Sequence, residues 1–521
     1  MVGRTVLAFA LVLGLATAAG AATPNRPESL SALARDVDRA ESVRAVKDLQ
    51  RTYAQYLQFG LWREAAAMYA ENATAQYAEG APVRGRAAIA RALLANSGHE
   101  GLNPGQINTR LIEEPLVNLE PDGEHAKGRW YGFFLLADGK GAASIQGGVY
   151  ENDYVRQGGR WKIAALRFHP QYDGPYETGW TNWKNQPIGF VPYHFTADET
   201  GKPDLGAGGP PKPTKATPRQ LAARIQALVD EQKVRNLQDA YGYYVDRRMW
   251  DDVGDLFSSR DGALESSGLG VYQGKAGVAR GLERMGPKGL THGILNDHVF
   301  FDMVVSVSPG GHEAFARGVS LGMIGDADKG TARWEVTLFR NRFVKESGLW
   351  KMREIRTFPH FRSDYAIGWG KDRQVQPTPT GAAGPDKIEP RPTALEQEHV
   401  IPAFLGPNPA TGLPVAAPEG YHFAGGTPLT GPADAAPIAA APKTDAAWYA
   451  EQRRKLAMAT AWDGAENVNT AYGESIDDFQ WPLMGAIFGT KGAKEVPFAG
   501  YYIGGERITN AVVAEYGPPP M

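Results

Sequence analysis

The stretch YGYYVDRRMW, residues 241–250, decides the fold because a close relative of it, YGESIDDFQW, recurs at residues 472–481. Both stretches place a Tyr-Gly pair, an Asp and a Trp at the same spacing. A third version, YAQYLQFGLW at residues 53–62, keeps the Tyr and the Trp but holds Gln58 where the first holds Asp246. A spacing that recurs within one chain indicates an internal repeat.

The repeats divide the chain into two complete units and part of a third. The complete units are predicted at residues 33–180 and 220–370, and they close with the related stretches GRWKIAALRFHPQYDGPYETGW and GLWKMREIRTFPHFRSDYAIGW. Residues 181–219 and 371–445 are rich in Pro, Gly and Ala and predict linkers, parts of which dock through isolated aromatic residues. Residues 446–521 predict a partial third repeat without the covering strands. Either the sequence stops inside a longer product or this segment docks on another unit.

Each complete unit is predicted to begin with helices and to continue with strands. In the second unit, apolar residues from Ile225 to Leu237 recur at a spacing near 3.6, which indicates a helix with one buried face. The stretch GVYQGKAGVARGL predicts a short strand, a turn at Gly274 and another helix. EAFARGVSLGMIG, ARWEVTLFRNRFVKE and WKMREIRTF read as strands. Helices followed by strands predict an α+β unit with an antiparallel sheet folded over its helices.

The N-terminus has the features of a secretory signal peptide, predicted at residues 1–22. One Arg precedes an apolar run, and small residues follow up to Ala19-Gly20-Ala21, an A-x-A cleavage pattern. The apolar run is short for a membrane-spanning helix. We therefore expect an exported protein, periplasmic or extracellular, without membrane attachment after cleavage. An uncleaved anchor is the alternative.

Composition restricts the class of ligand. The chain has 55 Lys and Arg against 58 Asp and Glu, a net charge of -3, so no basic surface for nucleic acid is predicted. The absence of cysteine excludes disulfides, thiolate metal sites and cysteine nucleophiles. The ten His residues are scattered without a metal-binding motif, and the sequence contains no nucleophile elbow. A small molecule is therefore expected as the ligand.

The Tyr-x-x-x-x-Asp-x-x-x-Trp helix, the Gly-turn-helix and the closing G-x-W-K strand together resemble the SnoaL-like branch of the nuclear transport factor 2-like superfamily. The resemblance covers both complete units and the third. It implies tandem cone-shaped domains, each a curved antiparallel sheet around N-terminal helices and a deep pocket. Single domains of this family usually pair through their sheets, which implies an internal pseudo-dimer of units one and two.

The resemblance also implies a catalytic pair. In relatives such as scytalone dehydratase and bile acid dehydratase, an Asp at the pocket end of the first helix works with a His from the region before the next strand. The Asp matches Asp246, and we match the His to His292 in LTHGILNDHVFF. Unit one then holds Gln58 and Asn108, so it resembles a site that has lost its titratable groups.

Further residues complete the expected site. We predict Tyr241, Tyr244, Trp250 and Arg356 as substrate-binding residues and Asp477 as the acid of a site in the third repeat. His298 and His360 are weaker candidates.

Structural alternatives accompany these assignments. Asp246 is alternatively a helix-end residue or an ion-pair partner of Arg247 or Arg353. The tyrosines are alternatively core residues. Arg356 has a counterpart, Arg167, in the unit without the catalytic pair, which favours a structural role.

The predicted function is that of an exported lyase, either a dehydratase or an aldol-type enzyme, or of an isomerase. The expected substrate is a hydrophobic aromatic or polycyclic small molecule, and an Asp/His acid-base pair needs no metal or organic cofactor. The alternative is a non-catalytic tandem module that binds a ligand or a protein, because relatives include binders as well as enzymes. Whether Asp246 and its His partner face one shared cavity discriminates between the two.

Overall fold

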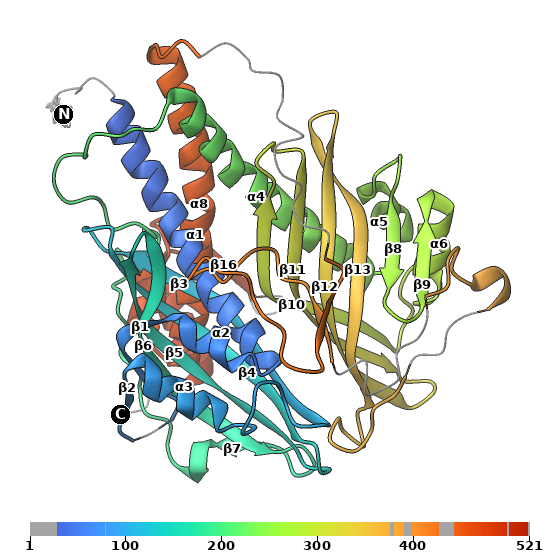
Figure 1. The fold of residues 1–521 in the computed structure, drawn as a ribbon. Coiled ribbons are helices and arrows are strands. Elements are labelled where there is room, and N and C mark those ends of the chain that lie inside the picture. The colour runs from blue at the N-terminus through green and yellow to red at the C-terminus, as the bar shows by residue number, and fades with distance from the viewer. Residues whose placement is uncertain are drawn as a thin grey trace, which may run out of the picture.

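The computed structural model describes residues 29–78, 80–375, 380–389, 399–426, 442–496 and 500–518. The predicted signal peptide lies outside these ranges. Within them, no helix combines the length and the apolar character that crossing a membrane requires. Two units of helices and sheet, and a smaller third unit, are arranged around three long helices (Figure 1).

Unit one begins with a long helix and continues into a large sheet. Ser29 caps the first helix, because its side chain accepts a hydrogen bond from the backbone N–H of Ala32. The helices are α1 Leu30–Gln58, α2 Trp62–Ala67 and α3 Arg86–Leu94. The strands are β1 Tyr69–Gln76, β2 Val83–Arg84, β3 Gln106–Leu119, β4 His125–Asp138, β5 Ala143–Gln157, β6 Arg160–Pro175 and β7 Thr181–Asn182, and the 3-10 helix η1 Trp183–Asn185 follows.

Unit two repeats this order. Thr217 and Gln220 form a capping box at the start of its first helix, each side chain bonding the backbone N–H of the other. The helices are α4 Pro218–Asp246, α5 Trp250–Leu256 and α6 Gly274–Glu283. The strands are β8 Ala263–Ser266, β9 Gly270–Gln273, β10 Ile294–Val307, β11 Glu313–Asp326, β12 Thr331–Glu346 and β13 Leu349–Asp364.

The two sheets share their strand order and their irregularities. The orders are β3-β4-β5-β6-β1-β2 and β10-β11-β12-β13-β8-β9. The four long strands of each sheet are antiparallel, but β1 pairs with β6, and β8 with β13, in parallel, which the prediction of antiparallel sheets did not include. The first long strand of each unit carries a bulge, where Glu114 has φ 55 and Asp302 has φ 53. The predicted α+β class, with two curved sheets each preceded by helices, is confirmed.

The third unit has the helical part of the repeat. It consists of α8 Ala446–Asp477, α9 Trp481–Ile487, the hairpin β16 Ala493–Val496 and β17 Gly500–Ile503, and α10 Gly505–Tyr516. The indole N–H of Trp481 donates to the carbonyl of Gly517, as that of Trp250 donates to Gly286 in unit two. Among the described residues of this unit, no long strands cover the helices.

The N-terminal halves of α1, α4 and α8 pack against one another, as Figure 1 shows in blue, green and red. Their contacts form one apolar cluster of buried residues, made by Leu33, Ala34, Val37 and Ala40 of α1, Leu221, Ile225, Leu228 and Val229 of α4, and Leu456 and Ala459 of α8. The N-terminal half of each long helix therefore packs in the shared cluster, and its C-terminal half packs in its own unit.

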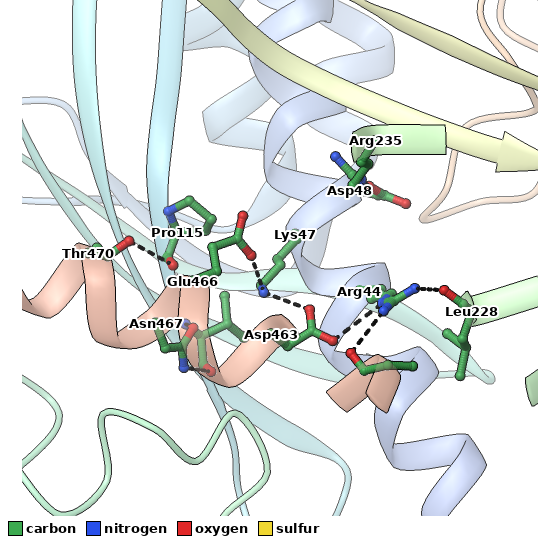
Figure 2. A network of polar contacts seen from close by, with 12 residues as sticks. Arg44, Lys47, Asp48, Pro115, Leu228, Arg235, Asp463, Glu466, Asn467 and Thr470 are labelled. Atoms are coloured by element: carbon green, nitrogen blue, oxygen red, sulfur yellow. Dashed lines mark hydrogen bonds and ion pairs between the residues drawn. The ribbon is translucent and has the colours of Figure 1, made fainter. Parts of the chain in front are cut away.

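A buried charged network lies next to this apolar cluster (Figure 2). The ammonium of Lys47, on α1, lies 2.8 Å from Asp463 and 2.6 Å from Glu466, both on α8. Arg44 contacts Asp463 at 3.3 Å and Glu231 of α4 at 3.1 Å, and it donates to the backbone carbonyl of Leu228. Each buried charge has a partner of opposite charge, and the network joins α1 to both α4 and α8.

The third unit docks on the open edge of the first sheet. Strand β3 is the edge strand, and the amide of Asn467 on α8 both accepts from the N–H of Val117 at 3.2 Å and donates to its carbonyl at 2.8 Å. At the end of α8, the fully buried Arg129 of β4 pairs with Glu474 at 2.7 Å and Asp478 at 3.1 Å. Docking on another unit, which the sequence analysis considered for residues 446–521, is therefore observed for α8 and its C-terminal end.

Units one and two pack together through residues of their sheets. Apolar residues of β11, β12 and β13 belong to the same buried cluster as the core of unit one, among them Val319, Leu338 and Phe358. The indole N–H of Trp369 donates to the carbonyl of Leu136 of β4 at 2.9 Å. The two complete units thus form an internal two-domain arrangement.

The connecting arms follow this packing. In the first arm, Phe195 is buried and stacks on Tyr193, whose hydroxyl donates to Asp478 at 2.7 Å, whereas Phe190 is exposed. The second arm carries β14 Val400–Pro402 and β15 His422–Ala424, which pair in parallel. The predicted docking of isolated aromatic residues therefore holds for part of the first arm.

Candidate active site

The end of α4 brings Asp246 to the first long strand of the second sheet. One carboxylate oxygen, Oδ1 of Asp246, accepts two hydrogen bonds from His298 on β10, from its backbone N–H at 2.9 Å and from ring Nδ1 at 3.0 Å. Asn296, two residues earlier on the same strand, donates to the carbonyls of Val245 and Asp246. The end of the helix and the strand are therefore locked together around the Asp–His pair.

The pairing of Asp246 with His292 is wrong. His292 lies in an exposed turn before β10, and its ring is not part of the cavity wall described below. The partner is His298, which the sequence analysis ranked lower. The alternative ion pairs of Asp246 are not formed either, because Arg247 pairs with Asp297 at 3.5 Å and Arg353 pairs with Asp261 and Glu313.

His298 forms part of the wall of a cavity of about 690 Å³ inside unit two. This volume is in the range of small-molecule sites. The wall is built from α4, α6 and all four long strands of the sheet. Its apolar residues include Val245, Leu264, Leu269, Met285, Ile294, Phe300, Ile324, Phe339 and Ile355. Asp246 lies behind His298 and is not itself part of the wall.

Tyr241 is the predicted substrate-binding residue that does line the cavity. Burial, reinforced by the nearby charge of Asp246, raises the pKa of its phenol well above the ordinary value. The phenol therefore stays protonated at physiological pH and faces the cavity as a neutral hydrogen-bonding group.

Three other predicted substrate-binding residues lie outside the cavity wall. Tyr244 packs at the margin of the apolar core of unit two, and Trp250 is buried in that core with its indole bound to Gly286. Arg356 is excluded by strand alternation, because its neighbours Ile355 and Thr357 line the cavity and Arg356 points to the opposite face. There its guanidinium pairs with Glu265 at 2.6 Å, in the structural role that Arg167 had suggested.

Unit one shows what replaces the pair. The amide of Asn108 donates to the carbonyl of Leu57, as Asn296 donates to Val245, so Asn108 is the counterpart of Asn296 and not of the His. Two residues further along β3, Arg110 takes the place of His298. Gln58, which is buried, takes the place of Asp246 as the last residue of α1.

Cross-strand registers identify the residues that fill unit one. Arg110 pairs with Phe134 across the β3–β4 ladder, where His298 pairs with Gly322 across β10–β11. The guanidinium of Arg110 lies over the Phe134 ring, 4.5 Å from its centroid. Unit one thus has a large ring at the position where unit two has glycine.

A second exchange of the same kind lies two strands away. Tyr150 pairs with Phe168 in unit one, where Phe339 pairs with Thr357 in unit two. The rings of Tyr150 and Phe168 are 4.7 Å apart, and that of Phe134 is 5.1 Å from Phe168. The interior of unit one is packed with aromatic rings at the place where unit two has its cavity.

Asp477 ends α8 as Asp246 ends α4, but it is exposed. The two neighbouring carboxylates, Glu474 and Asp478, bind Arg129 of unit one. No histidine contacts Asp477 among the described residues, so the structure brings no acid-base pair together in the third unit. No cluster of three or more His, Asp or Glu residues suited to a metal ion occurs in the described part of the chain either.

Comparison with known families agrees with this geometry. The family model of the SnoaL-like domain matches twice, at residues 38–167 and 226–356, inside the two complete units. The chain belongs to the SnoaL-like family. Its second copy retains an Asp–His pair beside a cavity, and its first copy does not.

Solved structures similar to this SnoaL-like chain share low sequence identity with it. One is a protein described as a putative scytalone dehydratase from Novosphingobium aromaticivorans, 19% identical, with 31% of this chain and 95% of that chain covered and a TM-score of 0.24. Another, from the same organism, is described as a nuclear transport factor 2-like protein with a cystatin-like fold, 24% identical, with 28% and 90% covered and a TM-score of 0.23. A third is a hexachlorocyclohexane dehydrochlorinase from Novosphingobium barchaimii, 14% identical, with 29% and 99% covered and a TM-score of 0.24. No curated protein matches the chain.

Proposed function

We propose that unit two is the active centre of an exported lyase or isomerase that acts on a hydrophobic small molecule by acid-base chemistry. The observation that carries the proposal is the hydrogen-bonded pair of Asp246 and His298 at the wall of a cavity of about 690 Å³ that both apolar and polar side chains line. The proposal of export rests on residues 1–22, which lie outside the described residues.

The hydrogen bond assigns a role to each nitrogen of His298. A carboxylate oxygen only accepts, so Nδ1 carries the hydrogen in its bond to Asp246. In the neutral ring, Nε2 then holds a lone pair and serves as the base that contacts substrate. Asp246 fixes this tautomer and stabilises the imidazolium that forms, which makes it the positioning residue of the pair.

The pair suits a reaction in which a carbon-bound proton leaves from a position next to a carbonyl or a phenol. Nε2 of His298 takes the proton, and the electron pair shifts towards the carbonyl or the ring. In a dehydration the imidazolium returns the proton to the departing hydroxyl group, which leaves as water. In an isomerisation the same proton returns to another carbon. Tyr241 lines the same cavity, and we assign to its neutral phenol the donation of a hydrogen bond to the oxygen on which charge develops.

Purified mature protein would be screened by mass spectrometry against hydroxylated aromatic, sterol-like and polyketide-like compounds without added cofactor. The wild type should give a product lighter by water or formaldehyde, or of unchanged mass. His298→Gln and Asp246→Asn should lose this activity by about 10² to 10⁴-fold, the usual contribution of a general base. Asp297→Asn is the matched control, because Asp297 is the neighbour of His298 on β10 and pairs with the exposed Arg247.

If the wild type and His298→Gln both bind a compound and release it chemically unchanged, the proposal of an enzyme is rejected. The alternative, a module that only binds its ligand, is then supported. Activity in the wild type that His298→Gln keeps in full would reject the assignment of the base.

A further inference from the structure

Arg248 combines a strained backbone with a buried side chain that has no ion-pair partner among the described residues. Its backbone has φ 50, in the left-handed region that side chains other than glycine rarely adopt. Its side chain is 8% exposed, and the buried Nε has no hydrogen-bond partner. No carboxylate lies within 4 Å of its guanidinium among the described residues. A strained residue whose buried charge has no ion-pair partner indicates a function.

The same position in the other units shows that the backbone turn does not need an arginine. The N–H of Arg248 bonds the carbonyl of Val245, as that of Gly60 bonds Leu57 in unit one. The third unit repeats the turn at Phe479, with φ 56, and Gly60 has φ 66. Unit one, whose interior is filled, uses glycine, which adopts this conformation without strain. The arginine occurs in the unit that has the cavity.

The guanidinium forms part of the cavity wall. Gly286 makes room for it, because a Cβ on Gly286 would lie 2.4 Å from one terminal nitrogen of Arg248. Burial lowers the pKa of Arg248 from its ordinary value, and the group remains a cation at neutral pH. Arg248 therefore adds a hydrogen-bond donor with a full positive charge to the wall of the cavity that His298 also lines.

Two of the three acidic residues of the wall pair with other basic side chains. Asp326 lies in the field of Arg248 but binds Lys329 at 2.6 Å. Glu335 is held by Arg333 at 2.5 Å and Arg362 at 3.2 Å. The third acidic residue of the wall, Asp328, is exposed. None of the three carboxylates forms an ion pair with Arg248, which leaves its guanidinium available to an anionic group of a ligand.

We propose that the molecule bound in unit two carries an oxyanion, such as a carboxylate, that pairs with Arg248 and directs the apolar body of the ligand towards His298. This inference rests on the proposed function for the identity of the cavity as the substrate site. A planar guanidinium binds a carboxylate or a phosphate through two parallel hydrogen bonds, so either group satisfies Arg248. The substrate class is therefore an amphipathic acid, with one anionic end and a hydrophobic remainder.

Isothermal titration calorimetry tests the proposal with three probes of the same apolar body: 2-naphthoate, 2-naphthyl phosphate and the neutral 2-naphthamide. The wild type should bind at least one anion about tenfold or more tightly than the amide, as expected for a charge-assisted hydrogen bond. The two anions distinguish a carboxylate site from a phosphate site. Arg248→Gln should abolish the preference and leave the affinity for the amide within about threefold. Arg247→Gln is the control, because Arg247 is exposed and should keep the preference.

Stability gives a second readout that a structural arginine would move in the other direction. Arg248→Gly, which installs the residue of unit one, should leave the Tm of the unliganded protein equal or higher and remove the rise in Tm caused by the anionic probe. A clearly lower Tm would show that the guanidinium supports the fold and would overturn the proposal. Equal wild-type affinity for all three probes, or no binding of either anion at millimolar concentration, would also overturn it.

The two proposals fail separately. His298→Gln should keep the anion preference, because Arg248 does not contact His298 in the structure. Loss of the preference in Arg248→Gln combined with full activity in His298→Gln would reject the acid-base assignment and leave the anion site standing.

Discussion

Exchanging one cross-strand residue between the two units should reduce stability in unit one and ligand binding in unit two. Phe168 is 3% exposed in unit one and packs on Tyr150 and Phe134. Its counterpart Thr357 lines the cavity of unit two, opposite Phe339. We therefore consider Phe168→Thr and Thr357→Phe as a matched pair of variants in the same chain.

The expected free energies follow from the packing. Phe168→Thr deletes a buried ring and leaves a hydroxyl in an aromatic interior, so the free energy of unfolding should fall by about 3 to 5 kcal/mol. Thr357→Phe adds a ring to open space beside Phe339, and cavity filling commonly adds about 0.5 to 2 kcal/mol. It also removes the hydrogen bond from the Thr357 hydroxyl to the carbonyl of Glu265, worth about 1 kcal/mol. The net change for Thr357→Phe should therefore be within about 1 kcal/mol of zero.

Urea unfolding followed by tryptophan fluorescence measures both stabilities, and calorimetric titration with 2-naphthoate measures the cavity. Thr357→Phe should bind the probe at least about tenfold more weakly than the wild type, because the ring takes the space of the ligand. Phe168→Thr should retain the wild-type affinity, since its effect lies in unit one. Unchanged binding in Thr357→Phe, or a loss of stability below about 1 kcal/mol in Phe168→Thr, would refute the reasoning that aromatic rings close unit one and their absence opens unit two.

Three further outcomes follow from other parts of the molecule. Burial, with a contribution from a nearby arginine, lowers the pKa of His360 from 6.5 to about 4. As the pH falls from 6.5 to 4, the unfolded chain therefore takes up a proton at His360 that the folded chain does not, and the free energy of unfolding should drop by about 3 kcal/mol. His360→Gln should remove this part of the pH dependence, as measured by urea unfolding. Asn467→Ala removes the side chain that bonds both the N–H and the carbonyl of Val117. The free energy of unfolding should therefore fall by about 2 to 5 kcal/mol, and limited proteolysis should release residues 446–516 sooner. A change below about 0.5 kcal/mol would show that this contact does not hold the third unit. Installing the missing pair in unit one by Gln58→Asp and Arg110→His should not restore turnover to a chain inactivated in unit two, and recovered activity in the mass-spectrometric assay would contradict the filled interior.

The helices, the strands and the repeat could be predicted because they depend on local patterns. The apolar residues that recur at a spacing near 3.6 before Tyr241 lie in α4, and the turn at Gly274 lies between β9 and α6 as predicted. The position of Asp246 at the end of the first helix of unit two could be predicted for the same reason. The Tyr, Asp and Trp of the repeated pattern lie close together in the sequence, in this helix and at the start of the next one.

The histidine partner of Asp246 was misassigned because the sequence analysis aligned the first long strands of the two units four residues away from their observed alignment. His292 was aligned with Asn108 in the sequence analysis, whereas the bulges at Glu114 and Asp302 and the matching contacts of Asn108 and Asn296 align Asn108 with Asn296. Strand alternation offered a signal: Asn296, His298 and Phe300 are spaced by two and all line the cavity. Treating this stretch as a strand would have favoured His298 over His292, and the same alternation would have excluded Arg356.

The contrast between a filled and an open unit could not be predicted from single positions. It depends on pairs such as Tyr150 with Phe168 and Phe339 with Thr357, which meet only once the strands are in register. Arg248 was overlooked for a related reason, because an arginine after a helix end has no distinctive pattern. Its significance comes from a left-handed backbone and from burial beside the cavity.

Deuterium uptake from D2O tests the central claim, proton abstraction by His298, most directly. A cavity ligand identified by the binding measurements would be incubated in D2O with the wild type, with His298→Gln and with the control Asp297→Asn, and the site and extent of labelling would be read by mass spectrometry and NMR. We predict deuterium at one carbon-bound position of recovered ligand or product with the wild type and the control, and a loss of about 10² to 10⁴-fold in His298→Gln. Equal labelling with and without His298, or no labelling and no product with the wild type, would contradict it.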